Sequence, residues 1–463
     1  MSSTNRIQWD LDLIRRYDLS GPRYTSYPTA LQFDPELSAT ELVEAGRSSA
    51  DQSSPLSLYV HIPFCEHVCY YCACNKVITR RRDKAQPYLD TVYQEMEQLS
   101  RWYSGDRQVN QLHWGGGTPT FISDQQMRDL MTHLRSNFNL RDDDKGDYSI
   151  EVDPREAQDT SLQVLREIGF NRISLGVQDL DPQVQEAVNR IQPTEQTLRV
   201  LHTSRELGFK SINMDLIYGL PHQTLDGFNA TLDSVIEMSP DRLSVFNYAH
   251  LPDRFRSQRH IQAEHLPSPE TKLDILQSTI EKLLAAGYVY IGMDHFAKPN
   301  DELALAQANG HLHRNFQGYT THSDCDLVAM GVSAISQIGD VYYQNEHEIS
   351  AYSQAVADRG NAVRRGVKLT TDDHIRRAVI TQLICHFELK PAQIESDFGI
   401  SFSHYFQKEL ESLGQFAEDG LISLNADLIR VTDAGRLLIR RICMAYDAYI
   451  PQETATRRYS RII

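Results

Sequence analysis

Four cysteines crowd into one short segment of this sequence. Cys65, Cys69, Cys72 and Cys74 lie within YVHIPFCEHVCYYCAC, and the first three have the spacing CxxxCxxC. Three thiolates on one loop suit a 4Fe-4S cluster that leaves one iron open to a substrate or cofactor. The alternative is structural zinc held by all four sulfurs, although Cys72 and Cys74 are poorly spaced for a paired zinc knuckle. Cys65, Cys69 and Cys72 are therefore the candidate metal ligands.

Glycines and polar residues follow the next strands that the sequence predicts. The glycines of HWGGGTPT let the backbone approach a ligand closely. A simple turn would explain the glycines alone, and a salt bridge to a neighbouring helix would explain a single carboxylate. Five successive strands that end in such residues at the same rim of the barrel instead indicate a binding site. The residues are Gly115, Gly116, Gly117, Glu151, Asp153, Gln178 and Asp215, with Arg190 in the helix just beyond.

Repeated βα units are expected to position these groups. From Leu56, short apolar or β-branched runs alternate with stretches of helical period. Parallel strands joined in this way imply a full or partial (β/α) barrel with its active site at the carboxyl ends of the strands. The predicted strands are 56–62, 109–114, 148–152, 172–177, 212–218, 242–248 and 288–293. The predicted helices include 123–138 capped by Ser123, 194–207 closed by Gly208, and 269–286 closed by Gly287.

Three consecutive domains are expected along the chain. Residues 1–55 show no sustained period and predict an irregular arm that closes over the active site. The barrel covers 56–360, and a helical domain follows at 361–463, with Thr371 as the cap of its first helix. Residues 403–432 predict a helix followed by a two-stranded wing, as in winged-helix proteins.

Composition excludes several classes of partner. The formal net charge of the 463-residue chain is −16, which opposes non-specific binding to nucleic acid and to anionic lipid. No apolar run approaches the roughly 20 residues that cross a bilayer, and the start of the sequence lacks the apolar core of a signal peptide. We expect a cytoplasmic monomer without membrane or nucleic-acid partners. Cys325, Cys385 and Cys443 stand alone and are expected to be small buried hydrophobes.

The cysteine loop resembles that of the radical S-adenosylmethionine (SAM) superfamily, in which an aromatic residue, here Tyr71, precedes the third cysteine. Within that superfamily the chain resembles the coproporphyrinogen oxidases, whose motif continues to Cys74, whereas related haem chaperones typically have Phe there. The resemblance implies an α/β fold, a partial (β/α) barrel of the radical SAM type. It extends through GPRYTSYPTA, QLHWGGGTPT, EVDPRE, FNRISLGVQD, DLIYGLP, DRLSVFNYAHLP, GMDHFA, HRNFQGYTT and MGVSAIS.

The resemblance also implies two SAM molecules beside the cluster. The first would be held by Tyr59, Gly116, Glu151 and Ile335. The second would be held by Tyr71, Gly117, Thr118, Gln178, Arg190, Asp215 and Ala249. Tyr71 departs from the Phe expected in the family and adds a hydroxyl to that contact.

The implied substrate is coproporphyrinogen III, whose propionates need cations or hydrogen-bond donors. Arg314 is the favoured cation, because Phe316 and Gln317 beside it match residues that the family uses near its active site. Arg23 and the basic run at 80–84 are further candidates, although a solvated helix start explains the run equally well. The implied reaction is abstraction of a propionate β-hydrogen by a 5′-deoxyadenosyl radical, loss of carbon dioxide and transfer of one electron to an acceptor. Two such rounds would give protoporphyrinogen IX.

Two alternatives stay open. A haem chaperone of the same fold would bind haem without converting coproporphyrinogen. A zinc-stabilised winged-helix protein would bind nucleic acid and hold no iron. The resemblance requires an electron donor and an electron acceptor, neither of which the sequence identifies.

Overall fold

The computed structural model describes residues 6–35, 37–51, 54–103 and 106–450. These residues form two compact units, each assembled from separate stretches of the chain. The sheet unit comprises 33–275 and 324–368, and the helical unit comprises the described residues up to 32, 276–323 and those from 369 onward. This division differs from the three consecutive domains expected above. None of the described helices is both long enough and apolar enough to cross a membrane.

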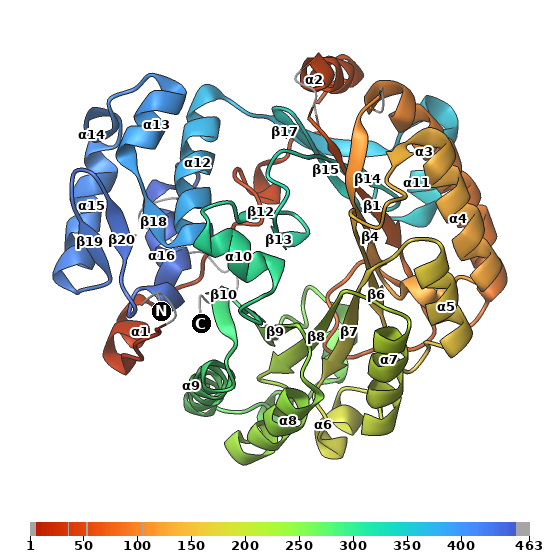
Figure 1. Ribbon diagram of the computed structural model, residues 1–463, viewed down its shortest axis with the longest axis horizontal. Coiled ribbons are helices and arrows are strands. Elements are labelled where there is room, and N and C mark those ends of the chain that lie inside the picture. The colour runs from red at the N-terminus through yellow and green to blue at the C-terminus, as the bar shows by residue number, and fades with distance from the viewer. Residues whose placement is uncertain (1–5, 36, 52–53, 104–105, 451–463) are drawn as a thin grey trace. The chain divides into compact units, whose positions relative to one another are not determined.

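A largely parallel sheet forms the centre of the sheet unit (Figure 1). Neighbouring strands from β9 to β14 pair in parallel along the order β9-β8-β7-β6-β4-β1-β14, and β15, β16 and β17 continue the sheet with antiparallel pairing. β1 is buried on both faces of the sheet, with Leu56, Leu58, Val60 and Ile62 on one face and the polar Ser57 and His61 on the other. The strands are β1 (Leu56–Ile62), β4 (Gln108–Gly116), β5 (Asn139–Leu140), β6 (Asp147–Val152), β7 (Arg172–Gln178), β8 (Ser211–Tyr218), β9 (Arg242–Asn247), β14 (Asp326–Met330), β15 (Ile335–Ile338), β16 (Val341–Asn345) and β17 (Val363–Lys368). Six of the seven predicted strands are confirmed as parallel strands to within two residues.

Crossover helices connect these strands, and Figure 1 shows α3, α4, α5 and α7 along the outside of the sheet. Ser123 caps α4 as predicted, because its hydroxyl accepts the Gln126 amide while the Gln126 side chain accepts the Ser123 amide. Gly208, at φ +79°, follows the end of α7. The helices are α2 (Ala39–Asp51), α3 (Ala85–Tyr103), α4 (Asp124–Asn137), α5 (Asp159–Glu167), α6 (Pro182–Ala187), α7 (Thr194–Glu206), α8 (Leu225–Met238), α9 (Pro269–Ala285) and α11 (Ile349–Arg359).

The first 55 residues are less irregular than expected. Residues 1–5, 36 and 52–53 lie outside the described part, but the rest contains α1 (Leu11–Tyr17) and α2. Ser38 and Glu41 cap the start of α2, since the Ser38 hydroxyl accepts the Glu41 amide and the Glu41 carboxylate accepts the Ser38 amide. The expectation of an arm without regular structure is therefore wrong for this stretch.

Residues 21–28 of the arm are hydrogen-bonded to the C-terminal part of the helical unit. Arg440 Nε donates to the Pro22 carbonyl at 2.9 Å, and the Tyr24 hydroxyl donates to Asp447 Oδ2 at 2.9 Å. Both the Tyr24 and the Arg440 side chains are buried. Residues 21–28 are therefore an integral part of the helical unit, which explains why this unit is discontinuous in sequence, whereas α2 belongs to the sheet unit.

Three sequence expectations are wrong in the helical unit. Residues 288–293 do not form another parallel strand, because Gly292 and Met293, both at positive φ, reverse the chain and β10 pairs antiparallel with β11. The cap of α12 is Thr370 rather than Thr371, since the Thr370 hydroxyl accepts the Asp373 amide. The wing has a third strand, in the order β18-β20-β19. The elements are β10 (Val289–Gly292), β11 (His295–Ala297), α10 (Glu302–Ala308), β12 (His313–Asn315), β13 (Gly318–Thr320), α12 (Thr371–His386), β18 (Glu388–Leu389), α13 (Pro391–Phe398), α14 (Phe402–Tyr405), α15 (Gln407–Glu418), β19 (Ile422–Leu424), β20 (Ile429–Val431) and α16 (Ile439–Cys443).

Candidate functional site

The cysteine loop leaves the sheet directly after β1. Its first cysteine, Cys65, lies in β2 (Phe64–Cys65), which pairs with β3 (Val77–Ile78), and the remaining cysteines lie on the loop between these strands. Side chains from elsewhere in the sheet unit hold the loop backbone. Asn189 Nδ2 donates to the Val68 carbonyl at 2.7 Å, and Gln258 Nε2 donates to the Tyr71 carbonyl at 3.0 Å. The loop conformation is therefore fixed by the protein itself.

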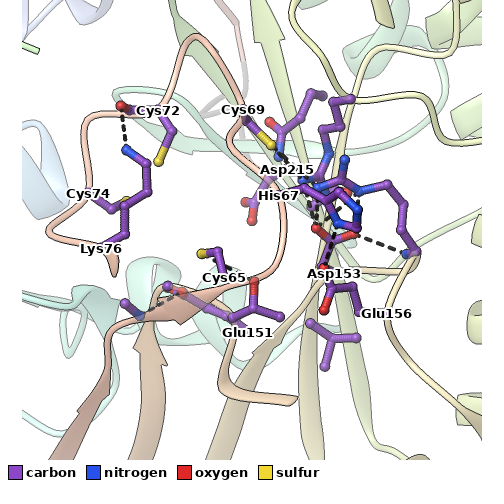
Figure 2. A pocket seen from close by; sticks show the side chains of 18 of the residues that line it. Cys65, His67, Cys69, Cys72, Cys74, Lys76, Glu151, Asp153, Glu156 and Asp215 are labelled. Carbon is purple, nitrogen blue, oxygen red and sulfur yellow. Dashed lines mark hydrogen bonds and ion pairs between the residues drawn. The ribbon is translucent and has the colours of Figure 1, made fainter. Parts of the chain in front are cut away.

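Cys65, Cys69 and Cys72 lie around a common open space (Figure 2). Together with the strand ends they line a pocket of about 230 Å³. Within the described residues, no three cysteine sulfurs lie within 4.8 Å of one another, whereas tetrahedral zinc with bonds of about 2.3 Å requires sulfurs about 3.8 Å apart. The donor set therefore fits a larger group with thiolate ligands, such as a 4Fe-4S cluster, and does not fit a single zinc ion.

Cys74 acts as a partner of Cys72. A hydrogen bond from the Cys74 thiol lowers the pKa of Cys72 to about 6, and Lys76 adds to this effect although burial opposes it. The same hydrogen bond raises the pKa of Cys74. Burial raises the pKa of Cys65 to about 12, with the Thr118 hydroxyl 3.5 Å from its sulfur as a small opposing influence. Cys72 thus becomes a thiolate more readily than Cys65.

The glycine segment after β4 packs directly against the start of the cysteine loop. The Gly117 amide donates to the Ile62 carbonyl and the Thr118 amide donates to the Phe64 carbonyl, each at 2.8 Å. A Cβ at Gly117 would lie 2.7 Å from the carbonyl carbon of Pro63. Glycine is therefore required at this position by close contact with the chain's own backbone, whereas the sequence predicted that the glycines allow close approach of a ligand.

Glu151 presents a carboxylate to the pocket. Its Oε2 accepts the Gly116 amide at 3.1 Å, His113 Nε2 lies 3.5 Å from its Oε1, and its side chain remains 47% exposed. Burial opposes ionisation, but the hydrogen bonds from His113 and Gly116 outweigh it and lower the pKa of Glu151. An ionised carboxylate with free acceptor capacity suits a ligand that offers amine or hydroxyl groups.

Two arginines and one carboxylate surround Cys69. Asp153 Oδ2 accepts Arg155 Nη2 at 2.6 Å and Arg190 Nη1 at 3.0 Å. The same two nitrogens lie 3.4 Å and 3.5 Å from the Cys69 sulfur. Burial opposes ionisation of Asp153, but Arg190 and Arg155 lower its pKa to about 2. The charged groups beside Cys69 are therefore held in place by their ion pairs with one another.

Asp215 lies further along the same rim of the sheet. Its oxygens accept the Ser174 hydroxyl and Asn213 Nδ2, each at 2.8 Å. Burial raises the pKa of Asp215 despite these hydrogen bonds. Gln178, at the end of β7, has φ +69°, a strained backbone conformation that is common at functional sites.

The structure brings most of the sequence-predicted residues together. Those that line the pocket are Cys65, Cys69, Tyr71, Cys72, Gly116, Gly117, Thr118, Glu151, Gln178, Arg190 and Asp215. Tyr59, Ala249 and Ile335 belong to the sheet unit but are not among the lining residues, and the Tyr59 hydroxyl instead contacts His61 Nδ1 at 3.0 Å. Lining residues missed by sequence reasoning include His67, Lys76, Arg155, Glu156 and Ser174. The motif EVDPRE contained Arg155 and Glu156, but nothing in it indicated contact with the cysteine loop.

Arg314, Phe316 and Gln317 belong to the helical unit. Arg314 is in β12, opposite Tyr319 of β13, and its guanidinium lies over the Tyr319 ring, 4.5 Å from the centroid. The residue is 8% exposed, and its Nε and Nη1 atoms are buried without a hydrogen-bond partner among the described residues. A buried cation in this state offers a site for an anion.

Comparisons with known proteins agree with this geometry. Residues 59–235 match the family model of the radical SAM superfamily, and residues 369–438 match that of the HemN C-terminal domain. The chain is 58% identical over 457 residues to the oxygen-independent coproporphyrinogen III oxidase of Pseudomonas aeruginosa, covering 99% of each chain. It is 53% identical over 461 residues to that of Escherichia coli K12, covering 100% of each. A solved structure of the E. coli coproporphyrinogen III oxidase HemN, a radical SAM enzyme, superposes with a TM-score of 0.91 at 51% identity over 96% of this chain and 100% of that one.

Proposed function

This chain belongs to the oxygen-independent coproporphyrinogen III oxidases of the radical SAM superfamily, and from that premise we propose which of its residues carry the reaction. The activity is oxidation of coproporphyrinogen III by radical SAM chemistry, with a 4Fe-4S cluster and SAM as the cofactors. We propose that two propionates become vinyl groups and that the product is protoporphyrinogen IX. The observation that supports this most strongly is the pocket in which three converging thiols meet the polar strand ends. Its cysteines need a reducing compartment, so we place the reaction in the cytoplasm.

Cys65, Cys69 and Cys72 hold the cluster, which when bound supplies the electron that cleaves SAM into methionine and a 5′-deoxyadenosyl radical. Glu151 accepts hydrogen bonds from the amine or ribose of that SAM, and the glycine segment lets it lie against the backbone. The loop contacts of Asn189 and Gln258 keep the thiols in place before any ligand arrives.

A second SAM molecule is held by the polar groups further along the rim. Arg190, Asp215 and Gln178 support this proposal, because they line the same pocket and are distinct from the groups around Glu151. Equilibrium dialysis of the anaerobic protein should give two SAM molecules per chain, falling to one in Asp215→Asn. A stoichiometry of one in the unsubstituted protein would refute this part of the proposal.

Arg314 anchors a propionate that is retained in the product. Its Nε and Nη1 atoms are buried without a hydrogen-bond partner among the described residues, and a carboxylate can accept a charge-assisted hydrogen bond from either of them. Phe316 and Gln317 follow it in the turn between β12 and β13, where the Gln317 amide donates to Asn315 Oδ1 at 2.9 Å and shapes the turn. Arg314→Met should raise KM for coproporphyrinogen III by about 10- to 100-fold, the worth of a charged hydrogen bond. Arg376, already paired with Glu409 and Asp372, provides the control, since Arg376→Met should leave KM unchanged.

An anaerobic assay tests the whole function. Reconstituted protein is mixed with a reductant, SAM and coproporphyrinogen III, and protoporphyrinogen IX and 5′-deoxyadenosine are followed together. Both products should form in the unsubstituted protein and in Cys325→Ala, and neither should form in Cys65→Ala. Cleavage of SAM without any vinyl product, together with tight haem binding, would favour the haem chaperone instead.

A further inference from the structure

Cys69 differs from the other two cluster cysteines in what surrounds its sulfur. It is the most buried of the three, at 8% exposure. Arg155 Nη2 and Arg190 Nη1 both approach its sulfur, at 3.4 Å and 3.5 Å. The sulfur of Cys65, by contrast, has the uncharged Thr118 hydroxyl at 3.5 Å. Two positive charges are therefore concentrated at one of the three ligand positions.

Arg155 is held in this position by a local turn. Its amide and its Nε both donate to Asp153 Oδ1 at 3.0 Å, and its Nη2 donates to Asp153 Oδ2 at 2.6 Å. The Glu156 amide closes the turn onto the Asp153 carbonyl at 3.0 Å. The Arg155 side chain is 12% exposed, so its charge is poorly screened by solvent. The guanidinium of Arg155 cannot leave Cys69 without breaking the hydrogen bonds of its Nε and Nη2 to the Asp153 carboxylate.

Charges and hydrogen bonds at cluster sulfurs set the reduction potential of an iron–sulfur cluster. Uptake of one electron adds one negative charge, so a nearby cation stabilises the reduced state and raises the potential. We propose that Arg155, clamped by Asp153, is a positioning residue that raises the reduction potential of the cluster through Cys69. The step concerned is transfer of one electron from a low-potential one-electron donor to the cluster, with no bond made or broken in the protein. This inference rests on the proposed function only in that it requires a 4Fe-4S cluster on the three cysteines. It does not depend on which substrate the protein converts.

The geometry predicts that substitutions of Arg155 and of Asp153 shift the reduction potential of the cluster in opposite directions. Arg155→Met removes a positive charge and a donor to sulfur, so the ratio of reduced to oxidised cluster at a fixed potential should fall about tenfold. For a one-electron couple, that is a shift of about 59 mV to lower potential. Asp153→Asn removes the negative charge and should shift the potential upward. Arg155→Lys keeps the charge and should shift it less than Arg155→Met.

The measurement is an anaerobic redox titration of the full-length reconstituted protein, without SAM or substrate, in which EPR detects the reduced cluster. Iron content is measured for every variant. Arg128→Met serves as the matched control, because Arg128 pairs with Glu167 on the surface and is 42% exposed. Its potential should equal that of the unsubstituted protein.

An unchanged potential in Arg155→Met at full iron content would overturn the proposal. If Arg155→Met fails to retain iron, the reduction potential of Asp153→Asn tests the proposal instead. An upward shift of that potential supports the proposal, and a downward shift or no shift contradicts it. A purely structural role would lower iron content in both variants and would not move their potentials in opposite directions. A protein that holds the cluster but forms no vinyl product would refute the proposed function while leaving this titration intact.

Discussion

Glu95 of α3 allows a quantitative test of the electrostatics of the sheet unit. It is 1% exposed, and its Oε2 accepts the Gly331 amide at 2.8 Å and the Tyr352 hydroxyl at 2.6 Å. Its Oε1 accepts Asn345 Nδ2 at 2.7 Å. Burial raises the pKa of Glu95 from its ordinary 4.5 to about 7, although these three donors oppose the shift.

The sign of the pH dependence follows from this shift. Between about pH 4.5 and pH 7 the folded chain keeps the Glu95 proton, whereas the unfolded chain has lost it. The free energy of unfolding therefore falls as pH rises through this window and is level above it. The shift from 4.5 to about 7 amounts to roughly 3 kcal/mol at about 1.4 kcal/mol per unit.

Glu95→Gln replaces the carboxyl group with an amide that does not titrate. The glutamine can accept two of the three donors with its oxygen but turns an amide toward Asn345 Nδ2, which costs roughly 1–3 kcal/mol at every pH. Relative to the unsubstituted protein, the free energy of unfolding of Glu95→Gln should therefore rise by roughly 2–3 kcal/mol from about pH 5 to about pH 7.5. The difference in the free energy of unfolding between the two proteins cancels the contributions of all other titrating groups.

Urea unfolding followed by tryptophan fluorescence at several pH values measures this difference. Gln94→Ala is the control, because Gln94 lies on the same helix, is exposed and has no titratable group. Its difference should not change with pH. A difference for Glu95→Gln that is equally flat would show that the buried carboxyl does not titrate as argued.

Three further changes have defined outcomes. Gly117→Ala should lower the iron content after reconstitution, because its Cβ would meet the Pro63 backbone, whereas Gly414→Ala meets nothing within 4 Å and should retain iron. Ser123→Ala should lower the free energy of unfolding by about 1 kcal/mol through loss of the capping box, measured by urea unfolding. Arg107→Met should cost about 3–5 kcal/mol in the same measurement, since it leaves the buried Asp326 without its ion pair at 2.6 Å, and an unchanged midpoint would contradict that reasoning.

Sequence reasoning succeeded where the signal is local. The strands before the cysteine and glycine segments, LSLYVHI and QVNQLHWGG, have apolar residues mostly at alternate positions, and Ser123 with Gln126 forms a capping box within four residues. The start of α2 carries the same kind of local signal, because Ser38 and Glu41 have the S-x-x-E spacing of a capping box. Thr370 and Thr371 fit the cap equally well by residue type, and only the observed hydrogen bonds distinguish them.

The rest depends on contacts that the sequence does not encode locally. Arg155 is distant in sequence from Cys69, and its contact with the sulfur arises only because β6 carries the turn to the same rim as the cysteine loop. The hairpin at β10 depends on the positive φ of Gly292 and Met293, which the continuous apolar run YVYIGM does not reveal. The two ends of the chain meet in the helical unit through contacts such as the hydrogen bond between Tyr24 and Asp447 and that between Arg440 and Pro22.

Those contacts between the chain ends have a consequence for synthesis on the ribosome. Every stretch of the sheet unit has been translated once residue 368 has emerged, so this unit can fold while the chain is still growing. Tyr24 and Arg23 emerge early, but their unit is completed by residues beyond 369. At translation rates of about 5–20 residues per second, the arm waits on the order of 10 s after the sheet unit is complete. During that interval its aromatic side chains are without their final partners, and they are a natural site for chaperone binding.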